Sequence, residues 1–169
     1  LGLSDNSFVV EIASNDGYLL KNFVSSGIPC LGIEPTKSTA AAASAIGVPV
    51  RQEFFGKNMG LSMANAEEQA DLVLGNNVFA HVPDINDFTE GVAALLKPNG
   101  VVTFEFPHLL QLIQQNQFDT IYHEHFSYLS LCSVSSIFKA AGLRAFDVEE
   151  LKTHGGSLRV YGCRGDASH

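Results

Sequence analysis

The chain of 169 residues has the length of one domain, and its hydrophobic content of 46% is enough to form a core. Its 10 Lys and Arg against 18 Asp and Glu argue against binding nucleic acid, which needs clustered basic side chains. The three cysteines, Cys30, Cys132 and Cys163, form no C-x-x-C pair. This argues against a zinc–thiolate site or a disulfide framework and favours a reducing, cytoplasmic compartment.

Membrane and export signals are missing from the chain. No apolar run approaches the roughly 20 residues that a membrane helix needs, and no basic segment followed by an apolar one opens the sequence. We therefore expect no membrane partner. The chain starts on Leu1 and soon enters a strand-like run, so we expect a fragment of a longer protein whose flanking domains are missing.

Strand-like and helix-like segments alternate in the first third of the chain. Short apolar runs at residues 7–14, 28–35 and 48–55 predict strands. Between them, residues 18–27 place their apolar side chains on one helical face. Residues 36–47 are rich in Ala and include hydroxyl residues suited to capping, which predicts a second helix.

The rest of the chain continues the alternation and then breaks it. Residues 70–80 and 101–107 predict strands on either side of an amphipathic helix at 84–100, and residues 133–142 predict a further helix. Two closing strands, 143–151 and 156–164, follow without a helix between them and should form an antiparallel edge hairpin. We therefore expect an α/β, Rossmann-like domain over residues 1–169, with a mostly parallel seven-stranded sheet.

The turn after the first strand, "EIASNDG", is where a doubly wound sheet binds its ligand. Only Gly17 matches the glycines of a dinucleotide fingerprint, so the turn is not suited to a diphosphate. Glu34 ends the second strand, close to the spacing at which an acidic residue binds a ribose. A ribose acceptor without a diphosphate cradle favours S-adenosylmethionine over NAD. Alternatively, Glu34 is a charge at the N-terminus of the next helix.

Several motifs carry a family resemblance. "VVEIASNDGYLL", "LGIEP", "NNVFAHVPD" and "GVVTFEFPHLL" resemble successive motifs of class I S-adenosylmethionine-dependent methyltransferases. "FDTIYHEHFSYLS" and "THGGSLRVY" narrow the resemblance to the C-methyltransferases of nucleotide-linked keto-deoxysugars. The resemblance covers nearly the whole chain, but Ala13 and Asn15 replace two glycines that are common in the wider superfamily. It implies S-adenosylmethionine as the cofactor and a small nucleotide sugar as the substrate.

The resemblance also implies which residues line the cofactor, and all follow the first four strands: Glu11, Ser14, Asn15, Gly17, Glu34, Pro35, Phe54, Asn76 and Asn77. Glu34 would bind the ribose hydroxyls, and Pro35 would lie near the adenine. Phe54 or Phe55 would cover the adenine ring, unless both belong to the core. The two asparagines would meet the amino-acid end of the cofactor or only cap a turn.

The segment "YHEH" at residues 122–125 allows three interpretations. A helical zinc pair needs two His four residues apart, whereas His123 and His125 are two apart, so we expect no metal. The segment could also be an aromatic loop that only packs. The third interpretation is acid/base chemistry, because methylating carbon requires a base to remove a proton beside a carbonyl. A His side chain, with an ordinary pKa of about 6.5, suits that step.

We assign His125 as the base, which the resemblance also implies. Glu124 and Tyr122 would orient and support it, and His81 would face the same cleft or only brace its loop. The segment "THGGSLR" allows two interpretations. It could bring His154, Ser157 and Arg159 to a sugar or a phosphate, or it could form a hairpin with Arg159 on its surface; we favour the hairpin.

The sequence therefore predicts C-methylation of a nucleotide-linked keto-deoxysugar through an enolate. The alternatives are an O- or N-methyltransferase of a small metabolite, or an S-adenosylmethionine-binding module without catalysis. A binding module has no need for a carbon-acid base, so the "YHEH" segment favours an enzyme.

Overall fold

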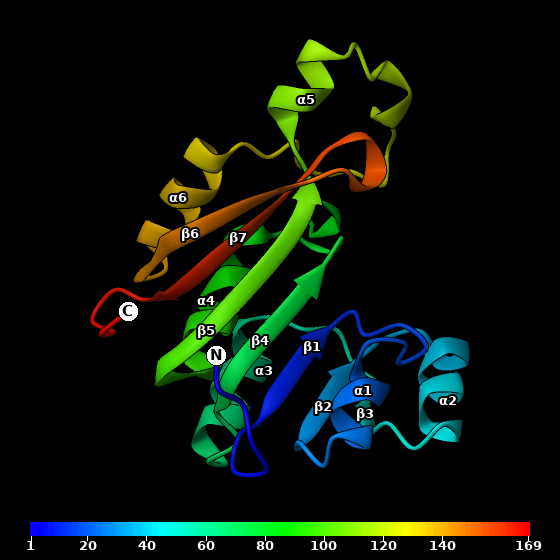
Figure 1. The fold of residues 1–169 in the computed structure, drawn as a ribbon, viewed down its shortest axis with the longest axis vertical. Helices are drawn as coiled ribbons and strands as arrows, with labels where there is room; N and C mark the ends of the chain where they lie inside the picture. The colour runs from blue at the N-terminus through cyan, green and yellow to red at the C-terminus, as the bar shows by residue number, and fades with distance from the viewer.

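A computed structural model of the chain describes residues 1–169, apart from the side chain of His154. Its centre is one seven-stranded sheet in the order β3-β2-β1-β4-β5-β7-β6 (Figure 1). The strands are β1 (Val9–Ile12), β2 (Cys30–Ile33), β3 (Val50–Arg51), β4 (Ala70–Asn76), β5 (Leu96–Pro107), β6 (Leu143–Leu151) and β7 (Ser157–Arg164).

The pairing of the strands confirms the predicted topology. β1 to β5 run parallel, and β7 pairs antiparallel with both β5 and β6. The first five strands are connected by helices, which lets each strand return in the same direction, whereas a short turn reverses the chain between β6 and β7. β7 lies inside the sheet, so β6 rather than β7 forms the edge. The fold is therefore the predicted Rossmann-like α/β arrangement.

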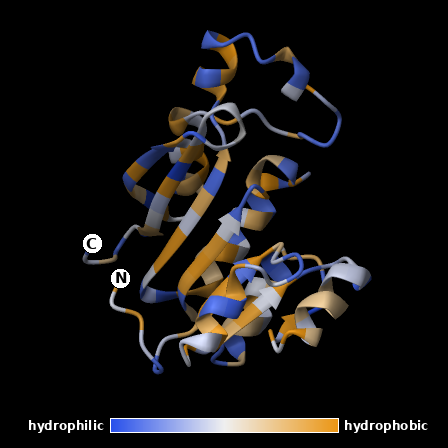
Figure 2. Ribbon diagram, turned by 45° about the vertical axis from the view of Figure 1, so that its right-hand side comes forward, coloured by the Kyte–Doolittle hydropathy of each residue, from blue (hydrophilic) through white to orange (hydrophobic). Residues whose placement is uncertain are grey.

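Helices cover the sheet on both faces. They are α1 (Leu20–Ser25), α2 (Lys37–Ala45), α3 (Lys57–Asn65), α4 (Ile85–Leu95), α5 (Leu109–Gln114) and α6 (Leu131–Ala140), with short 3-10 turns η1 (Phe79–His81), η2 (Phe118–Thr120) and η3 (Thr153–Gly155). Leu20 of α1 and Ala43 of α2 pack with Val9 on one face, whereas α3, α4 and α6 belong to a larger core on the other. Hydrophobic residues are concentrated in the strands (Figure 2).

Two helices were absent from the sequence prediction. In α3, Gly60 and the polar residues around it obscure the helical pattern, but Gly60 is what lets α3 approach α4, because a Cβ there would overlap the Gly91 carbonyl oxygen. α5 has no buried residue and is too short to show a period. β3 is also shorter than expected, and β5 begins before the predicted turn at residues 97–100.

α5 opens a segment, residues 109–128, that leaves the sheet and returns to it; we call it the arm (Figure 1). The ends of the arm are held together by a bridge between His108 and Leu129, where the Leu109 amide donates to the Leu129 carbonyl at 2.9 Å. The arm therefore projects beyond the end of β5 and carries the "YHEH" segment. None of the helices described is long and apolar enough to cross a membrane.

Candidate active site

The carboxyl ends of β1, β2 and β4 surround a cavity of about 570 Å³, which we call the turn cavity. Its size is typical of a small-molecule site, and its position is where parallel α/β sheets bind ligands. The residues that line it are Glu11, Ala13, Ser14, Asn15, Asp16, Tyr18, Leu19, Glu34, Asn76 and Asn77. Six predicted cofactor residues are therefore brought together here.

The turn after β1 follows a glycine-like path although two of its residues are not glycine. Ala13 and Asn15 have φ angles of 58° and 52°, in the left-handed region that a side chain disfavours. The amides of Ala13 and Ser14 both donate to the Ile33 carbonyl, which fastens the turn to β2. Gly17 does not line the cavity; a Cβ there would lie 3.0 Å from Val48, so its role is close packing.

Glu34 is 6% exposed, and both of its carboxylate oxygens accept backbone hydrogen bonds. Oε2 accepts from the Asn15 amide at 3.1 Å, and Oε1 accepts from the Thr36 amide at 2.8 Å. Thr36 is the N-cap of α2, so Glu34 does stabilise that helix terminus, as the alternative interpretation expected. Each oxygen keeps a second lone pair, and Glu34 lines the turn cavity.

Glu11 and Ser14 are buried polar residues whose hydrogen-bonding capacity is incompletely used. Glu11 is 5% exposed and Ser14 is 3% exposed. Oε2 of Glu11 and Oγ of Ser14 have no hydrogen-bond partner among the described atoms. Burial, helped by the charge of Asp16, raises the pKa of Glu11 to about 8. Since unpartnered buried polar atoms are costly, this end of the cavity is suited to a polar ligand.

A narrower apolar cavity of about 180 Å³ adjoins the turn cavity at Ala13, which lines both. Pro35, Phe54 and Phe55 all line it. Phe55 packs edge-on against Phe88 with ring centroids 5.4 Å apart, whereas Phe54 is 85% exposed. Phe55 therefore belongs to the core, and Phe54 is the aromatic ring free to cover a flat ligand.

A third cavity, of about 340 Å³, lies where the arm meets the sheet, and we call it the His125 cavity. The residues that line it are Asn77, Pro107, Gln117, Asp119, Thr120, Tyr122, His125 and Gly155. Asn77 also lines the turn cavity, so the two cavities meet at this side chain. The structure thus brings the predicted cofactor and catalytic residues to one end of the sheet.

The hydrogen bonds of His125 define its tautomer. Nδ1 lies 2.9 Å from the Thr120 carbonyl oxygen, and Nε2 lies 3.2 Å from the Tyr122 hydroxyl. Because a carbonyl only accepts, Nδ1 carries the proton, and Nε2 carries the lone pair, which accepts from the Tyr122 hydroxyl. A neutral imidazole with a lone pair on Nε2 is able to remove a proton from a ligand in this cavity.

The neighbours of His125 differ partly from the sequence interpretation. The Glu124 side chain is exposed and has no described hydrogen bond to His125; it is the Glu124 backbone carbonyl that lies 3.1 Å from Nδ1 of His81. The His81 ring lies 4.8 Å from the His125 ring, centroid to centroid. Burial, and secondarily the proximity of His125, lowers the pKa of His81, so His81 favours the neutral form.

Sequence reasoning missed the residues of the arm that complete the His125 cavity. The Thr120 contact uses a backbone carbonyl, which no residue pattern reveals. Gln117 and Asp119 line the same cavity, but neither lies in a periodic segment. No group of three His, Cys, Asp or Glu residues suited to a metal ion occurs among the described side chains.

The "THGGSLR" segment forms the favoured hairpin. Arg159 on β7 makes ion pairs with Glu105 at 2.8 Å and with Glu149 at 3.2 Å. Ser157 is buried, and its hydroxyl donates to the Thr153 carbonyl at 3.2 Å. The expectation for His154 lies outside the described side chains. Arg159 is therefore held by two carboxylates of the sheet.

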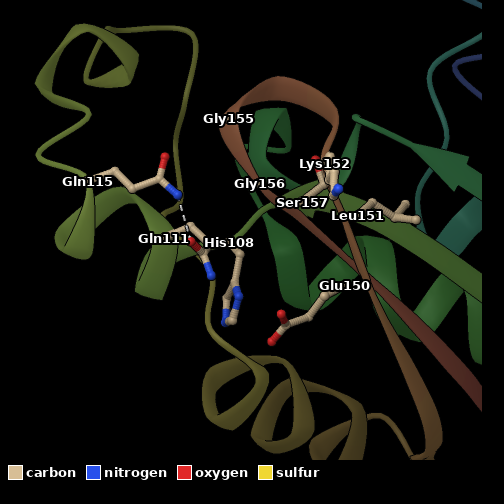
Figure 3. A pocket seen from close by; sticks show the side chains of 9 residues that line it. All are labelled: His108, Gln111, Gln115, Glu150, Leu151, Lys152, Gly155, Gly156 and Ser157. Atoms are coloured by element: carbon tan, nitrogen blue, oxygen red, sulfur yellow. Dashed lines mark hydrogen bonds between the residues drawn. The ribbon is translucent and has the colours of Figure 1, made fainter.

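A fourth cavity, of about 400 Å³, lies between α5 and the turn from β6 to β7 (Figure 3). His108, Gln111 and Glu150 lie around it, and Gly155 separates it from the His125 cavity by lining both. His108 is 8% exposed, and its Nδ1 has no described partner.

The sheet order, the turn after β1 and the cavities at the carboxyl edge define the class I methyltransferase fold. The family model described as "Methyltransferase domain" matches residues 2–148. The chain belongs to this family of methyltransferase domains.

Two relatives by sequence differ in chemistry. C-methyltransferase NovU of Streptomyces niveus is 41% identical over 169 residues, which is 100% of this chain and 40% of that protein. A ubiquinone biosynthesis O-methyltransferase of Rhodopseudomonas palustris (strain TIE-1) is 29% identical over 94 residues, 56% of this chain and 37% of that protein. The chain thus spans less than half the length of these relatives.

Solved structures share the fold at low identity. Magnesium protoporphyrin IX methyltransferase (ChlM) from Synechocystis PCC 6803, solved with bound SAH, has a TM-score of 0.70 at 12% identity and covers 94% of this chain and 74% of its own. The YcgJ protein from Bacillus subtilis has a TM-score of 0.70 at 13% identity, over 96% of this chain and 94% of its own.

Proposed function

We propose that this chain is the cofactor-binding core of an S-adenosylmethionine-dependent C-methyltransferase that acts beside the keto group of a nucleotide-linked deoxysugar. The identity of 41% to the C-methyltransferase NovU supports the reaction class. The junction of the turn cavity with the His125 cavity at Asn77 supports methyl transfer from one ligand to another.

The residues of the turn cavity and the adjoining apolar cavity fit this cofactor. When bound, S-adenosylmethionine supplies an electrophilic methyl group. The free lone pairs of Glu34 would accept hydrogen bonds from the ribose hydroxyls. Pro35 and Phe54 would hold the adenine, and the Glu11 carboxyl group, whose Oε2 is unpartnered, would lie near the positively charged sulfonium.

The observation that carries the proposal is the lone pair on Nε2 of His125, fixed by the Thr120 carbonyl. Carbon has no lone pair of its own, so methylation beside a carbonyl begins when a base removes a proton from that carbon. His125 would take this proton on Nε2. The Tyr122 hydroxyl would then donate a hydrogen bond to the developing enolate oxygen, where stabilisation of charge is most effective.

The charge of the His125 cavity supports a sugar as the group it holds. Its polar side chains are amide, hydroxyl, imidazole and carboxylate groups, and neither Lys nor Arg lines it in the described structure. Such a cavity suits a neutral ring with several hydroxyls better than a phosphate, which prefers basic partners. The nucleotide would therefore lie outside this cavity.

Exchange of the carbon-bound hydrogen tests the proposal apart from methyl transfer. The full-length protein would be incubated in deuterated water with a nucleoside-diphosphate keto-deoxyhexose and S-adenosylhomocysteine, and deuterium would be followed by NMR. We expect exchange in the wild type, its loss in His125→Asn, and normal exchange in His123→Asn, whose side chain is exposed. Normal exchange in His125→Asn would show that another group is the base.

A second outcome would favour the O- or N-methyltransferase alternative. An enzyme of that kind removes a proton from oxygen or nitrogen, so it would methylate a hydroxyl or amine without exchanging any carbon-bound hydrogen. NMR of the methylated product distinguishes a new C–C bond from a new C–O or C–N bond.

A further inference from the structure

Glu11 is a carboxylate that the strands enclose. It occupies β1 between Gly32 of β2 and Leu74 of β4 and is 5% exposed. Its Oε2 atom has no partner among the described residues, although the side chain lines the turn cavity. A carboxylate in such a position must either keep a proton or pair with a positive charge.

No basic side chain among the described residues provides that positive charge. Neither Lys nor Arg lines the turn cavity in the described chain. The charged and titratable groups that share the cavity with Glu11 are Asp16 and Tyr18 in the turn and Glu34 after β2, and Cys30 on β2 lies close enough to interact with its charge. Burial, and then Glu11 itself, raises the pKa of the Cys30 thiol, which keeps it neutral. β4 contributes the neutral amides of Asn76 and Asn77.

We propose that Glu11 is the residue by which this cavity distinguishes S-adenosylmethionine from S-adenosylhomocysteine, because it ionises and releases a proton when the sulfonium cofactor binds. The inference rests on the proposed cofactor. The two compounds differ by one methyl group and one positive charge, and at neutral pH the first has a net charge of +1 and the second has none.

The discrimination follows from the surroundings of Glu11. With a pKa raised to about 8 by burial, the side chain is mostly protonated at neutral pH. A net positive charge in the same poorly solvated cavity favours the ionised form and lowers the pKa. The neutral thioether provides no such net charge, so Glu11 stays protonated. The ion pair therefore strengthens binding of the cofactor and not of the product that must leave.

Calorimetry measures the proton directly. The full-length protein would be titrated at neutral pH with each compound in phosphate and in Tris, whose ionisation enthalpies differ. We expect release of close to one proton per S-adenosylmethionine bound and clearly less for S-adenosylhomocysteine. Affinity for S-adenosylmethionine should rise as the pH approaches 8, by at most about tenfold per pH unit, while affinity for the product changes less.

Two variants locate the effect. Glu11→Gln has the shape of the neutral carboxyl, so it should fold, bind both compounds with similar affinity and release no proton. Glu34→Gln changes a carboxylate of the same cavity that already accepts two backbone hydrogen bonds; it should weaken both compounds but keep the proton release.

The outcomes separate this inference from the proposed function. Binding of S-adenosylmethionine without proton release, equal release with both compounds, or retained release in Glu11→Gln would overturn the role of Glu11. Failure of the wild type to bind either compound would overturn the proposed cofactor, and with it this inference.

Discussion

The Tyr122 hydroxyl lies 3.2 Å from Nε2 of His125, the one ring nitrogen that the protein backbone leaves free. The two rings also pack against each other, tilted by 33° with centroids 4.3 Å apart, so the tyrosine contacts the imidazole ring as well as its Nε2 lone pair. Both residues belong to the arm, and their arrangement is set within three residues of sequence. The arm therefore brings to the cavity a base that is already oriented.

Tyr122→Phe removes the hydroxyl and keeps the ring. We expect the rates of hydrogen exchange and methyl transfer to fall by about tenfold or more, because the enolate oxygen loses a donor. Affinity for S-adenosylmethionine should not change, since Tyr122 does not line the turn cavity. Single-turnover kinetics would separate the two effects, and a selective loss of cofactor affinity would contradict the assignment.

Glu34→Ala removes the predicted ribose acceptor. We expect affinity for S-adenosylmethionine to fall by about tenfold or more, corresponding to the hydrogen bonds of a buried carboxylate. Calorimetry provides the measurement. The control is Asp5→Ala, which changes net charge equally but lies before β1, away from the carboxyl edge of the sheet. A change within about twofold in Glu34→Ala would refute the ribose assignment.

The framework of the fold was predictable because most buried strands consist of apolar runs rich in β-branched residues. β1, β2 and β4 follow directly from such runs, and the missing helix between β6 and β7 gave the edge hairpin. α3 was not predictable, because its buried face is made of Met59, Gly60 and Met63 among polar residues, and its packing on α4 depends on the close approach of Gly60 to Gly91. The packing of α3 against α4, which no local sequence pattern indicates, stabilises this helix.

The site was predictable where side chains carry the chemistry. The positions of Glu34 and of the "YHEH" segment relative to the strands indicated the two cavities. The role of the backbone was not predictable: the Thr120 carbonyl faces Nδ1 of His125, and the Glu124 carbonyl faces His81. Whether the Glu124 carboxylate supports catalysis stays a prediction.

Ala13→Gly tests the left-handed turn after β1. The φ angle of 58° places an alanine where L-residues are strained by about 1–2 kcal/mol. Glycine relieves that strain but is more flexible when unfolded, so we expect a net gain of about 0.5–1 kcal/mol in the free energy of unfolding. Urea denaturation is the measurement. The control Ala42→Gly, at an exposed position of α2, should instead destabilise by about 1 kcal/mol.

Gly91→Ala tests the contact between α3 and α4. A Cβ at Gly91 would lie 2.6 Å from the Gly56 carbonyl oxygen and 3.0 Å from the Lys57 amide nitrogen, so the helices would have to separate. We expect a loss of about 1–3 kcal/mol in the free energy of unfolding. Asn86→Ala, at an exposed position of α4, should change it by less than about 0.5 kcal/mol. Equal effects of the two substitutions would show that the helices adjust freely.

The stability of the ligand-free protein should depend on pH through Glu11. Its pKa is raised from 4.5 to about 8 in the folded protein, so between these values the folded state binds a proton that the unfolded state has lost. Below pH 4.5 both states are protonated and Glu11 has no effect. As the pH rises from 4.5 to about 8, stability falls because the folded state must keep a proton that the unfolded state releases; above about 8 both states are ionised and the loss stays constant, on the order of a few kcal/mol.

Glu11→Gln isolates this contribution, because the amide stays neutral at every pH. We expect the free energy of unfolding of the wild type to fall relative to Glu11→Gln between pH 5 and pH 8, since the ordinary pKa of 4.5 and the folded-state pKa of about 8 bound that window. Urea denaturation of both proteins at several pH values, without cofactor, measures the difference, and His81 and the other titrating groups cancel in it. Parallel pH profiles would mean that Glu11 is ionised in the folded protein, and that an unseen positive partner already compensates its charge.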